Sequence, residues 1–179
     1  MPINETYRTW IRQICELRPK QRKTQVQNFV WMLVGIFHSR SVSLSRIAGK
    51  VISTAKNVST VRRLSRFLAS SAVDVRSWYR STAKTWLVSQ AQQVGEIRLI
   101  VDGSKIGFGH QLLMVSLAYR RRSVPLAWTW VRHVRGHSPA TMQVALLKYV
   151  RSLLPQNMPV FLVGDSEFGS IAVLQQLKQ

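Results

Sequence analysis

The sequence predicts an α+β protein in which an all-α amino-terminal region is followed by an α/β domain. Residues 1–94 repeat apolar side chains at helical spacing and show no strand pattern, whereas residues 95–179 contain short apolar runs bounded by turn residues. Basic residues are also unevenly divided. The first part has 16 Lys or Arg against three acids, a net charge of +13, and the second has ten against four, a net charge of +6. We therefore expect two domains, residues 1–94 and 95–179, with a hinge at residues 90–95.

The whole chain carries 26 Lys or Arg against seven Asp or Glu, a net charge of +19 in 179 residues. An excess of this size indicates a polyanionic partner, for which nucleic acid is the first candidate. Charge alone leaves open a generally basic protein, such as a ribosomal protein or one that binds acidic membranes. The single cysteine, Cys15, excludes an intrachain disulfide and a thiolate zinc cluster, and fits a reducing cytoplasm. The longest apolar run, residues 29–37, is too short for a membrane span of about 20 residues.

Helical periodicity marks two long segments of the first domain. Asp74 precedes the second segment and is expected to cap it, because a carboxylate accepts hydrogen bonds from the free N–H groups of a first turn. The apolar stripes are Phe29, Met32, Leu33 and Ile36 in the first segment, and Val75, Trp78, Tyr79, Trp86 and Leu87 in the second.

Between these segments, the pattern predicts two shorter helices separated by a turn at residues 54–57. The second short helix carries Arg62, Arg63 and Arg66 beside its apolar positions, so the pair is a candidate helix-turn-helix whose arginines contact phosphates or base edges of double-stranded DNA. An amphipathic helix in a bundle, with its arginines in solvent, fits the same pattern. The apolar positions are Leu44, Ile47, Ala48 and Val51 in the first helix, and Val61, Leu64, Phe67 and Leu68 in the second.

The second domain is predicted to contain three antiparallel strands, a helix, a parallel strand and a final helix. Ser138 and Pro139 suit the N-cap and first position of the crossover helix, which Pro155 ends. A right-handed crossover through this helix places the later strand parallel to the first and beside it. The predicted strands are residues 97–101, 112–119, 126–134 and 159–163; the crossover helix has Met142, Leu146, Tyr149, Val150 and Leu153 on one face, and the final helix has Ile171, Leu174 and Leu177.

Asp102 and Asp165 each follow directly after an apolar strand of this predicted sheet. If those strands are neighbours about 4.8 Å apart, the two carboxylates can share a divalent cation. Hard oxygen ligands select Mg²⁺ or Mn²⁺, which can activate a water or a 3′-hydroxyl for attack on a phosphodiester. Each aspartate also has a local explanation, since Asp102 with Gly103 is a common turn dipeptide and Asp165 can cap the last helix. The occurrence of both on the expected strands favours the metal site.

Other titratable residues are not assigned to the metal. Glu167 lies near Asp165 but inside the turn, so we interpret it as an acid at a helix start. Three histidines, His110, His133 and His137, have no accompanying carboxylate or cysteine pattern. We expect them to have structural or phosphate-contacting roles.

Two segments of the second domain resemble a known family. Leu99-Ile-Val-Asp-Gly-Ser-Lys105 is similar to the first-aspartate strand of the DDE transposases of bacterial insertion sequences, and Val160-Phe-Leu-Val-Gly-Asp-Ser-Glu-Phe-Gly169 is similar to their second. The likeness extends over residues 96–179. The helix with Arg62, Arg63 and Arg66 also resembles the amino-terminal helical region of these enzymes.

This resemblance implies a truncated, incomplete RNase H-like catalytic domain behind a basic helical DNA-binding domain. For Asp102 and Asp165 it implies Mg²⁺ or Mn²⁺ binding in the DNA strand cleavage and transfer of transposition, a form of DNA recombination. It further implies a cytoplasmic, nucleoid-associated bacterial protein that binds the double-stranded DNA of transposon ends, with no membrane partner.

The sequence departs from the family at the third acid, a glutamate on a later helix, for which residues 1–179 offer no candidate. Two carboxylates hold a metal pair poorly, so we expect no transposase activity from this chain alone. We expect an amino-terminal fragment, either from a decayed gene or from the first of two reading frames, completed by a second product or another transposase copy. Two alternatives stay open: a DNA-binding remnant that inhibits an intact transposase, and another RNase H-like nuclease.

Overall fold

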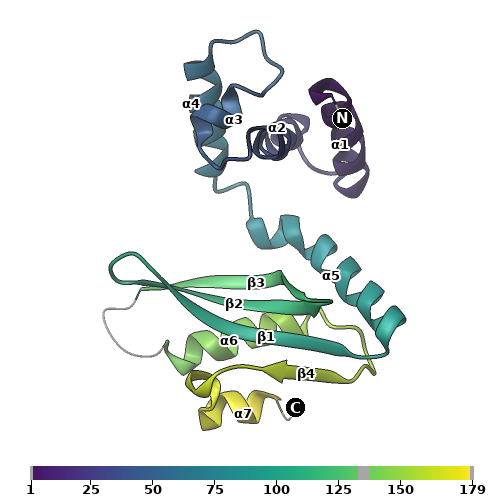
Figure 1. The fold of residues 1–179 in the computed structure, drawn as a ribbon, viewed down its shortest axis with the longest axis vertical. Helices are drawn as coiled ribbons and strands as arrows, with labels where there is room; N and C mark the ends of the chain where they lie inside the picture. The colour runs from purple at the N-terminus through teal and green to yellow at the C-terminus, as the bar shows by residue number, and fades with distance from the viewer. Residues whose placement is uncertain (1, 133–137, 178–179) are drawn as a thin grey trace. The chain divides into compact units, whose positions relative to one another are not determined.

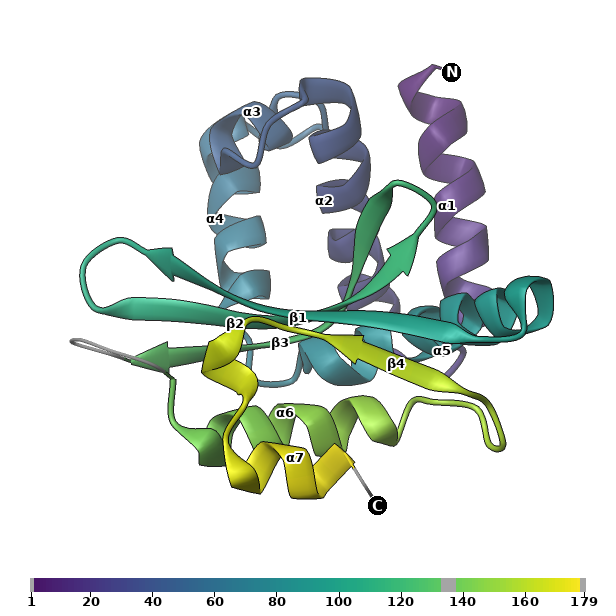
Figure 2. The same cartoon turned by 60° about the horizontal axis from the view of Figure 1, so that its bottom comes forward.

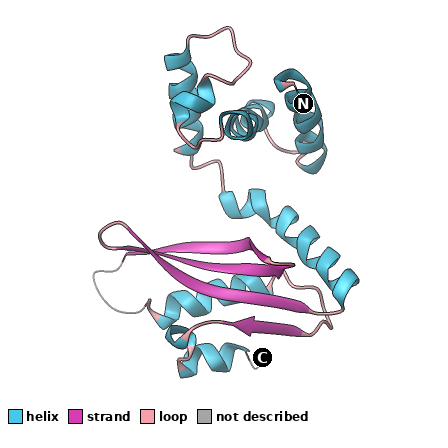
Figure 3. Ribbon diagram, viewed as in Figure 1, coloured by secondary structure: helices cyan, strands magenta, loops and turns pink. Residues whose placement is uncertain are grey.

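A computed structural model describes residues 2–132 and 138–177 of the chain. These residues form an α+β structure with seven α-helices, one short 3₁₀ helix and one four-stranded mixed sheet. The first five helices precede all of the strands, as Figure 3 shows. The chain divides into two compact units, Met1–Trp78 and Tyr79–Gln179. The division falls within a helix, and not at the expected boundary between residues 94 and 95.

The first unit is built around its second helix. This helix, α2, packs against α1 and also against the pair α3 and α4, so apolar residues are buried on two of its sides. The predicted stripe at Phe29, Met32, Leu33 and Ile36 was only partly right, because all four are partly buried and only Met32 and Ile36 pack against the buried cluster of Trp31, Ile47 and Leu64. Val26, Val30 and Val34 are buried among residues of α1, and Trp31 is buried with Ile47 and Leu64. The helices are α1 (Ile3–Leu17), α2 (Lys23–Ser39), α3 (Leu44–Ala48), α4 (Asn57–Leu68) and α5 (Val75–Val94), which continues into the second unit.

Asp74 caps α5 as predicted. Its two carboxylate oxygens accept hydrogen bonds from the backbone N–H groups of Arg76, at 3.2 Å, and Ser77, at 3.1 Å. The predicted apolar stripe of this helix was only partly right, since Val75 is 54% exposed and Trp86 is 37% exposed. The helix passes from one unit to the other, so its buried side changes along its length. In the second unit the buried positions are Ala83, Leu87, Gln90 and Ala91.

The sheet has the predicted topology. Its strand order is β3-β2-β1-β4, in which β1 pairs antiparallel with β2, β2 pairs antiparallel with β3, and β4 pairs parallel with β1 (Figure 1). Helix α6 is the crossover between β3 and β4, as expected for a right-handed connection. The elements are β1 (Ile97–Ile106), β2 (His110–Tyr119), β3 (Arg122–Arg132), α6 (Ala140–Arg151), β4 (Val160–Val163), the 3₁₀ helix η1 (Ser166–Phe168) and α7 (Ile171–Leu177).

The strands β1 to β3 are longer than the apolar runs that predicted them. Strand β1 continues past Asp102 to Ile106, because residues 102–106 pair with residues 110–114 of β2. The prediction that Asp102 follows the strand was therefore wrong, and so was its alternative as a turn residue. The turn lies further on, at residues 107–109, where Gly107 and Gly109 have positive φ angles of 59° and 89°.

The connection between β2 and β3 is shorter than the predicted residues 120–125. Tyr119 already pairs with Arg122, so only Arg120 and Arg121 form the turn, and Arg120 has a φ of 54°. Pro125 lies within β3 beside a register shift at Val115 and Ser116 of β2, which is where an edge strand accommodates proline. Residues 133 and 134, predicted to end this strand, lie outside the described residues.

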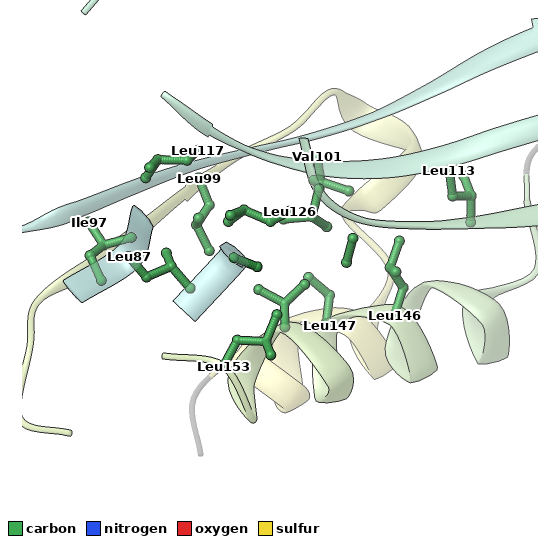
Figure 4. Packing of buried hydrophobic residues seen from close by; sticks show 14 of the residues in the cluster. Leu87, Ile97, Leu99, Val101, Leu113, Leu117, Leu126, Leu146, Leu147 and Leu153 are labelled. Atoms are coloured by element: carbon green, nitrogen blue, oxygen red, sulfur yellow. The ribbon is translucent and has the colours of Figure 1, made fainter. Parts of the chain in front are cut away.

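One hydrophobic core holds the second unit together. Along β1, Ile97, Leu99 and Val101 are buried while Arg98 and Ile100 are exposed, which is the period of two expected for a sheet with one covered face. Helices α6 and α7 lie on the covered face (Figure 2). Figure 4 shows strand and helix side chains meeting there, among them Leu87, Leu99, Leu113, Leu117, Leu126, Leu146, Leu147 and Leu153.

Candidate metal centre and nucleic-acid interface

Asp102 projects from the face of the sheet opposite to the core. It continues the exposed alternation of β1, two residues after Ile100, and its own side chain is exposed. Strand pairing holds the backbone of Asp102 on one side, where it pairs with Met114 of β2, while pairing with β4 ends two residues earlier at Ile100. The carboxylate is open to solvent.

Asp165 lies in line with Asp102 across the parallel pair β1 and β4. The last paired residues are Ile100 and Val163, and Asp102 and Asp165 each come two residues later. Adjacent strands are about 4.8 Å apart, so the same register places the two aspartates at adjoining positions. Sequence reasoning predicted that β4 is parallel to β1 and beside it, which the register confirms, although it placed the end of β1 too early.

Gly164 keeps the chain close to β1 after β4 ends. A Cβ atom at this position would lie 2.6 Å from Cγ1 of Val101 and 3.4 Å from its carbonyl oxygen. These distances are short because the backbone that leads to Asp165 passes directly beside the buried Val101. A side chain larger than hydrogen would have to push this backbone, and Asp165 with it, away from β1.

Asp165 also caps the short helix η1. Its Oδ1 accepts a hydrogen bond from the backbone N–H of Glu167 at 3.0 Å, and its carbonyl oxygen accepts one from Phe168 at 3.1 Å. The capping role and the metal role are compatible, because a carboxylate has lone pairs on two oxygens and the side chain is exposed.

Glu167 joins the Asp165 turn to the start of α6, a role that its place in the sequence did not reveal. Its Oε1 accepts hydrogen bonds from the Ser138 backbone N–H, at 2.7 Å, and from the Ser138 hydroxyl. The Gln111 amide on β2 donates to both carboxylate oxygens, at 3.3 and 3.4 Å. Gln143 donates to the Ser138 hydroxyl at 2.9 Å and to the Glu167 carbonyl at 3.4 Å. Gln111, Ser138 and Gln143 are all buried, so this is an interior polar network around one carboxylate.

The predicted start of α6 was wrong by one residue for the same reason. Helix α6 begins at Ala140 with Pro139 in the cap position, and no side chain caps it. The Ser138 hydroxyl, predicted to be the cap, donates to Glu167 instead. One feature of the sequence could have indicated this polar network. Gln111 is a polar residue within an apolar strand, and Gly103 on the neighbouring strand leaves room for its side chain. A Cβ atom at Gly103 would lie 2.3 Å from the Gln111 amide nitrogen.

The two aspartates fit a divalent cation in part. They supply hard oxygen donors on an exposed face, which suits Mg²⁺ or Mn²⁺. Within residues 2–132 and 138–177, no group of three or more His, Cys, Asp or Glu side chains is placed to hold a metal ion. Water or a phosphate oxygen would have to complete the coordination, as is usual for Mg²⁺. Of the histidines, His110 is exposed at the start of β2, and His133 and His137 lie outside the described residues.

The three arginines of α4 do not share one environment. Arg62 and Arg66 are exposed. Arg63 turns toward α2, where its Nε donates to Asn28 at 2.7 Å, its other guanidinium nitrogen donates to Gln27 at 2.8 Å, and its guanidinium lies 4.3 Å from the centroid of the Trp31 ring. Arg63 therefore links α4 to α2, which differs from the predicted DNA contact.

The α3–α4 pair also differs from the expected helix-turn-helix. The helices pack together, but residues 49–56 connect them, and a helix-turn-helix uses a turn of about three or four residues. The predicted turn at residues 54–57 overlaps the start of α4 at Asn57. Arg62 and Arg66 are the exposed arginines of α4.

No protein-family model, curated protein or solved structure matches this chain significantly. In the described part of the chain, no helix is both long and apolar enough to cross a membrane.

Proposed function

We propose that this chain is the amino-terminal part of a DDE-type transposase, with a helical unit that binds double-stranded DNA and an RNase H-like unit that brings two catalytic carboxylates to it. The single observation that carries the proposal is the parallel register of β1 and β4, whose last pair, Ile100 and Val163, lies two residues before Asp102 and Asp165. The strand order, with three antiparallel strands joined by two hairpins and a parallel fourth strand, supports the RNase H-like assignment.

The residues of the site suit phosphodiester chemistry on DNA. Asp102, on the sheet face opposite to α6 and α7, and Asp165, just after β4, are both exposed, so that a large polymeric substrate can reach them. A Mg²⁺ or Mn²⁺ ion bound there would stabilise negative charge at a phosphate and lower the pKa of an attacking hydroxyl or water. The net charge of +19 attracts the DNA backbone and offsets the repulsion between its phosphates and the two carboxylates.

A second candidate function is DNA binding without cleavage, as in an inhibitor of an intact transposase. It is favoured by the finding that the described residues bring only two carboxylates together at this position. DNA binding depends on the basic first unit and does not require the acids. The two candidates therefore make the same prediction for DNA affinity and different predictions for metal binding.

The test is a titration of the full 179-residue chain with Mn²⁺, in which free Mn²⁺ is followed by electron paramagnetic resonance. We expect one weak site that is lost in Asp102→Asn and in Asp165→Asn, because each removes one of two anionic ligands. Glu16→Gln is the matched control, since Glu16 is an exposed acid on α1 and its loss changes the net charge equally.

Equal Mn²⁺ binding by the wild type and both aspartate variants would overturn the metal centre. In that case, duplex binding measured on the same samples would decide whether the second candidate function stands.

A further inference from the structure

An exposed tryptophan lies on the sheet face of Asp102, opposite to α6 and α7. Trp130 on β3 is 54% exposed. It pairs with Leu112 on β2, which pairs with Ser104 on β1, and directly opposed residues in a sheet point to the same side. Ser104 is two residues from Asp102 on the same strand. Trp130 and Asp102 therefore project from one face.

The strand geometry gives the separation of these residues. Two strand spacings of about 4.8 Å and two residues along a strand, about 6.8 Å, place the Cα atoms of Trp130 and Asp102 roughly 12 Å apart. A single strand of nucleic acid covers this span with about two nucleotides. A phosphate at the acid pair and a base at Trp130 can therefore belong to one DNA strand.

Basic and aromatic residues surround this face at the same end of the sheet. Arg132 is exposed and pairs with His110, two residues beyond Trp130 on the same strand and therefore on the same face. Phe108 is fully exposed at the tip of the β1–β2 hairpin. Lys105 on β1 is a second basic residue at this end of the sheet. The net charge of +19 on the whole chain favours a polyanion over a second copy of this basic chain.

The exposed ring of Trp130 differs from that of Trp128, two residues earlier on β3. The Trp128 ring contacts that of Tyr79, with centroids 5.6 Å apart, and is partly buried. An indole that is half exposed beside an arginine is the arrangement by which proteins bind unpaired bases, because the ring stacks on a base while the guanidinium contacts a phosphate.

We propose that the sheet face opposite to α6 and α7, from the β1–β2 hairpin tip to the acid pair, binds single-stranded DNA, with Trp130 stacking on a base and Arg132 contacting the backbone. This deepens the proposed function and rests on it, since it assigns the form of DNA that approaches Asp102. The DNA near the acids is then unpaired, and duplex binding belongs to the first unit.

The experiment measures the affinity of the full chain for a 12-nucleotide oligothymidine and for a 12-base-pair duplex by fluorescence anisotropy. Trp130→Leu keeps an apolar strand residue and removes the ring, and Trp130→Phe keeps a ring. We expect Trp130→Leu to bind the single strand about tenfold more weakly, the effect of losing one stacked base, and to bind the duplex as the wild type does. Trp130→Phe should recover most of the single-strand affinity.

The outcomes of these titrations test the single-strand surface and the proposed function separately. Unchanged single-strand affinity in Trp130→Leu, or wild-type binding to the duplex only, overturns the stacking surface and leaves the proposed function standing. Absence of binding to either DNA overturns the proposed function itself. If Trp130→Leu does not fold, Arg132→Gln replaces it, because Arg132 is exposed; an unchanged salt dependence of single-strand binding in that variant would likewise overturn the surface.

Discussion

The Glu167 carboxylate accepts two hydrogen bonds from Ser138, one from its backbone N–H and one from its hydroxyl. Glu167 is two residues from Asp165, and Ser138 is two residues from the start of α6. This contact ties the turn that carries one candidate metal ligand to the crossover helix. The buried amide of Gln111 completes it from β2. The position of Asp165 thus depends on a polar network inside the unit as well as on strand pairing.

Replacing Glu167 with glutamine is expected to destabilise the second unit by about 1–3 kcal/mol. The neutral side chain loses charge-assisted hydrogen bonds, and an NH2 group replaces one of the two acceptor oxygens, so a donor of Gln111 or Ser138 is left without an acceptor. Urea unfolding measures the loss. Glu16→Gln, which removes an exposed acid of the same type, should change the free energy of unfolding by less than about 0.5 kcal/mol. Equal stability of the two variants would contradict the role of Glu167.

Replacing Gly164 with alanine is expected to weaken both folding and Mn²⁺ binding. The new methyl group would lie 2.6 Å from Val101 Cγ1, so the backbone before Asp165 must shift, at a cost of about 1–3 kcal/mol. The double variant Gly164→Ala, Val101→Ala removes the obstructing methyl groups. It should be less destabilised than the sum of the two single variants, as a thermodynamic cycle would measure. Strict additivity would show that this close approach is unimportant.

Variants of the α4 arginines are expected to affect either DNA affinity or stability, depending on the position. Arg62→Gln and Arg66→Gln should each reduce duplex affinity. Each should also reduce the slope of log K against log salt concentration by up to about 0.9 per lost phosphate contact. Arg63→Gln should mainly lower the melting temperature, because its guanidinium bonds to Asn28 and Gln27. Anisotropy titrations at several salt concentrations and thermal unfolding of the same three variants make the comparison. Loss of affinity confined to Arg63→Gln would reverse this assignment.

The 179-residue chain is expected to bind DNA with Mg²⁺ present and not to cut it. Two carboxylates are too few to hold a metal pair around a scissile phosphate. A supercoiled plasmid incubated with the chain and Mg²⁺ should show no nicking above that of an Asp102→Ala control. Nicking by the wild type that the Asp102→Ala variant lacks would contradict the prediction.

Tyr79 is expected to give the second unit a pH dependence at high pH. Burial raises the pKa of its phenol above the ordinary value, and its hydroxyl donates to the Pro125 carbonyl oxygen at 2.6 Å. Because the folded-state pKa is the higher one, this stabilisation is fully present below the unfolded pKa of about 10 and is lost as pH rises through the folded pKa. Tyr79→Phe should lack this decline when unfolding is measured between pH 8 and 11. An identical decline in the variant would assign the effect to other groups.

The sequence by itself determined the order and kind of the elements in the second unit. Short apolar runs such as residues 97–101 and 159–163 favour strands, and the helical spacing between them leaves one crossover that makes β4 parallel to β1. The first run is buried on one face as expected, whereas β4 is mostly exposed. The neighbouring positions of Asp102 and Asp165 follow from that topology. The cap at Asp74 was likewise predictable, because N-capping depends on residues close in the chain.

Tertiary structure alone decided which side chains face which partners. Helix α2 is apolar on several sides, so its buried positions Val26, Val30 and Val34 were set by the helices that pack on it. Arg63 on α4 donates hydrogen bonds to Asn28 and Gln27 of α2, which lie 35 and 36 positions earlier in the chain. Glu167 accepts a hydrogen bond from Ser138, which lies 29 residues earlier in the chain. Local periodicity carries no information about such distant pairs, since only the packed chain brings them together.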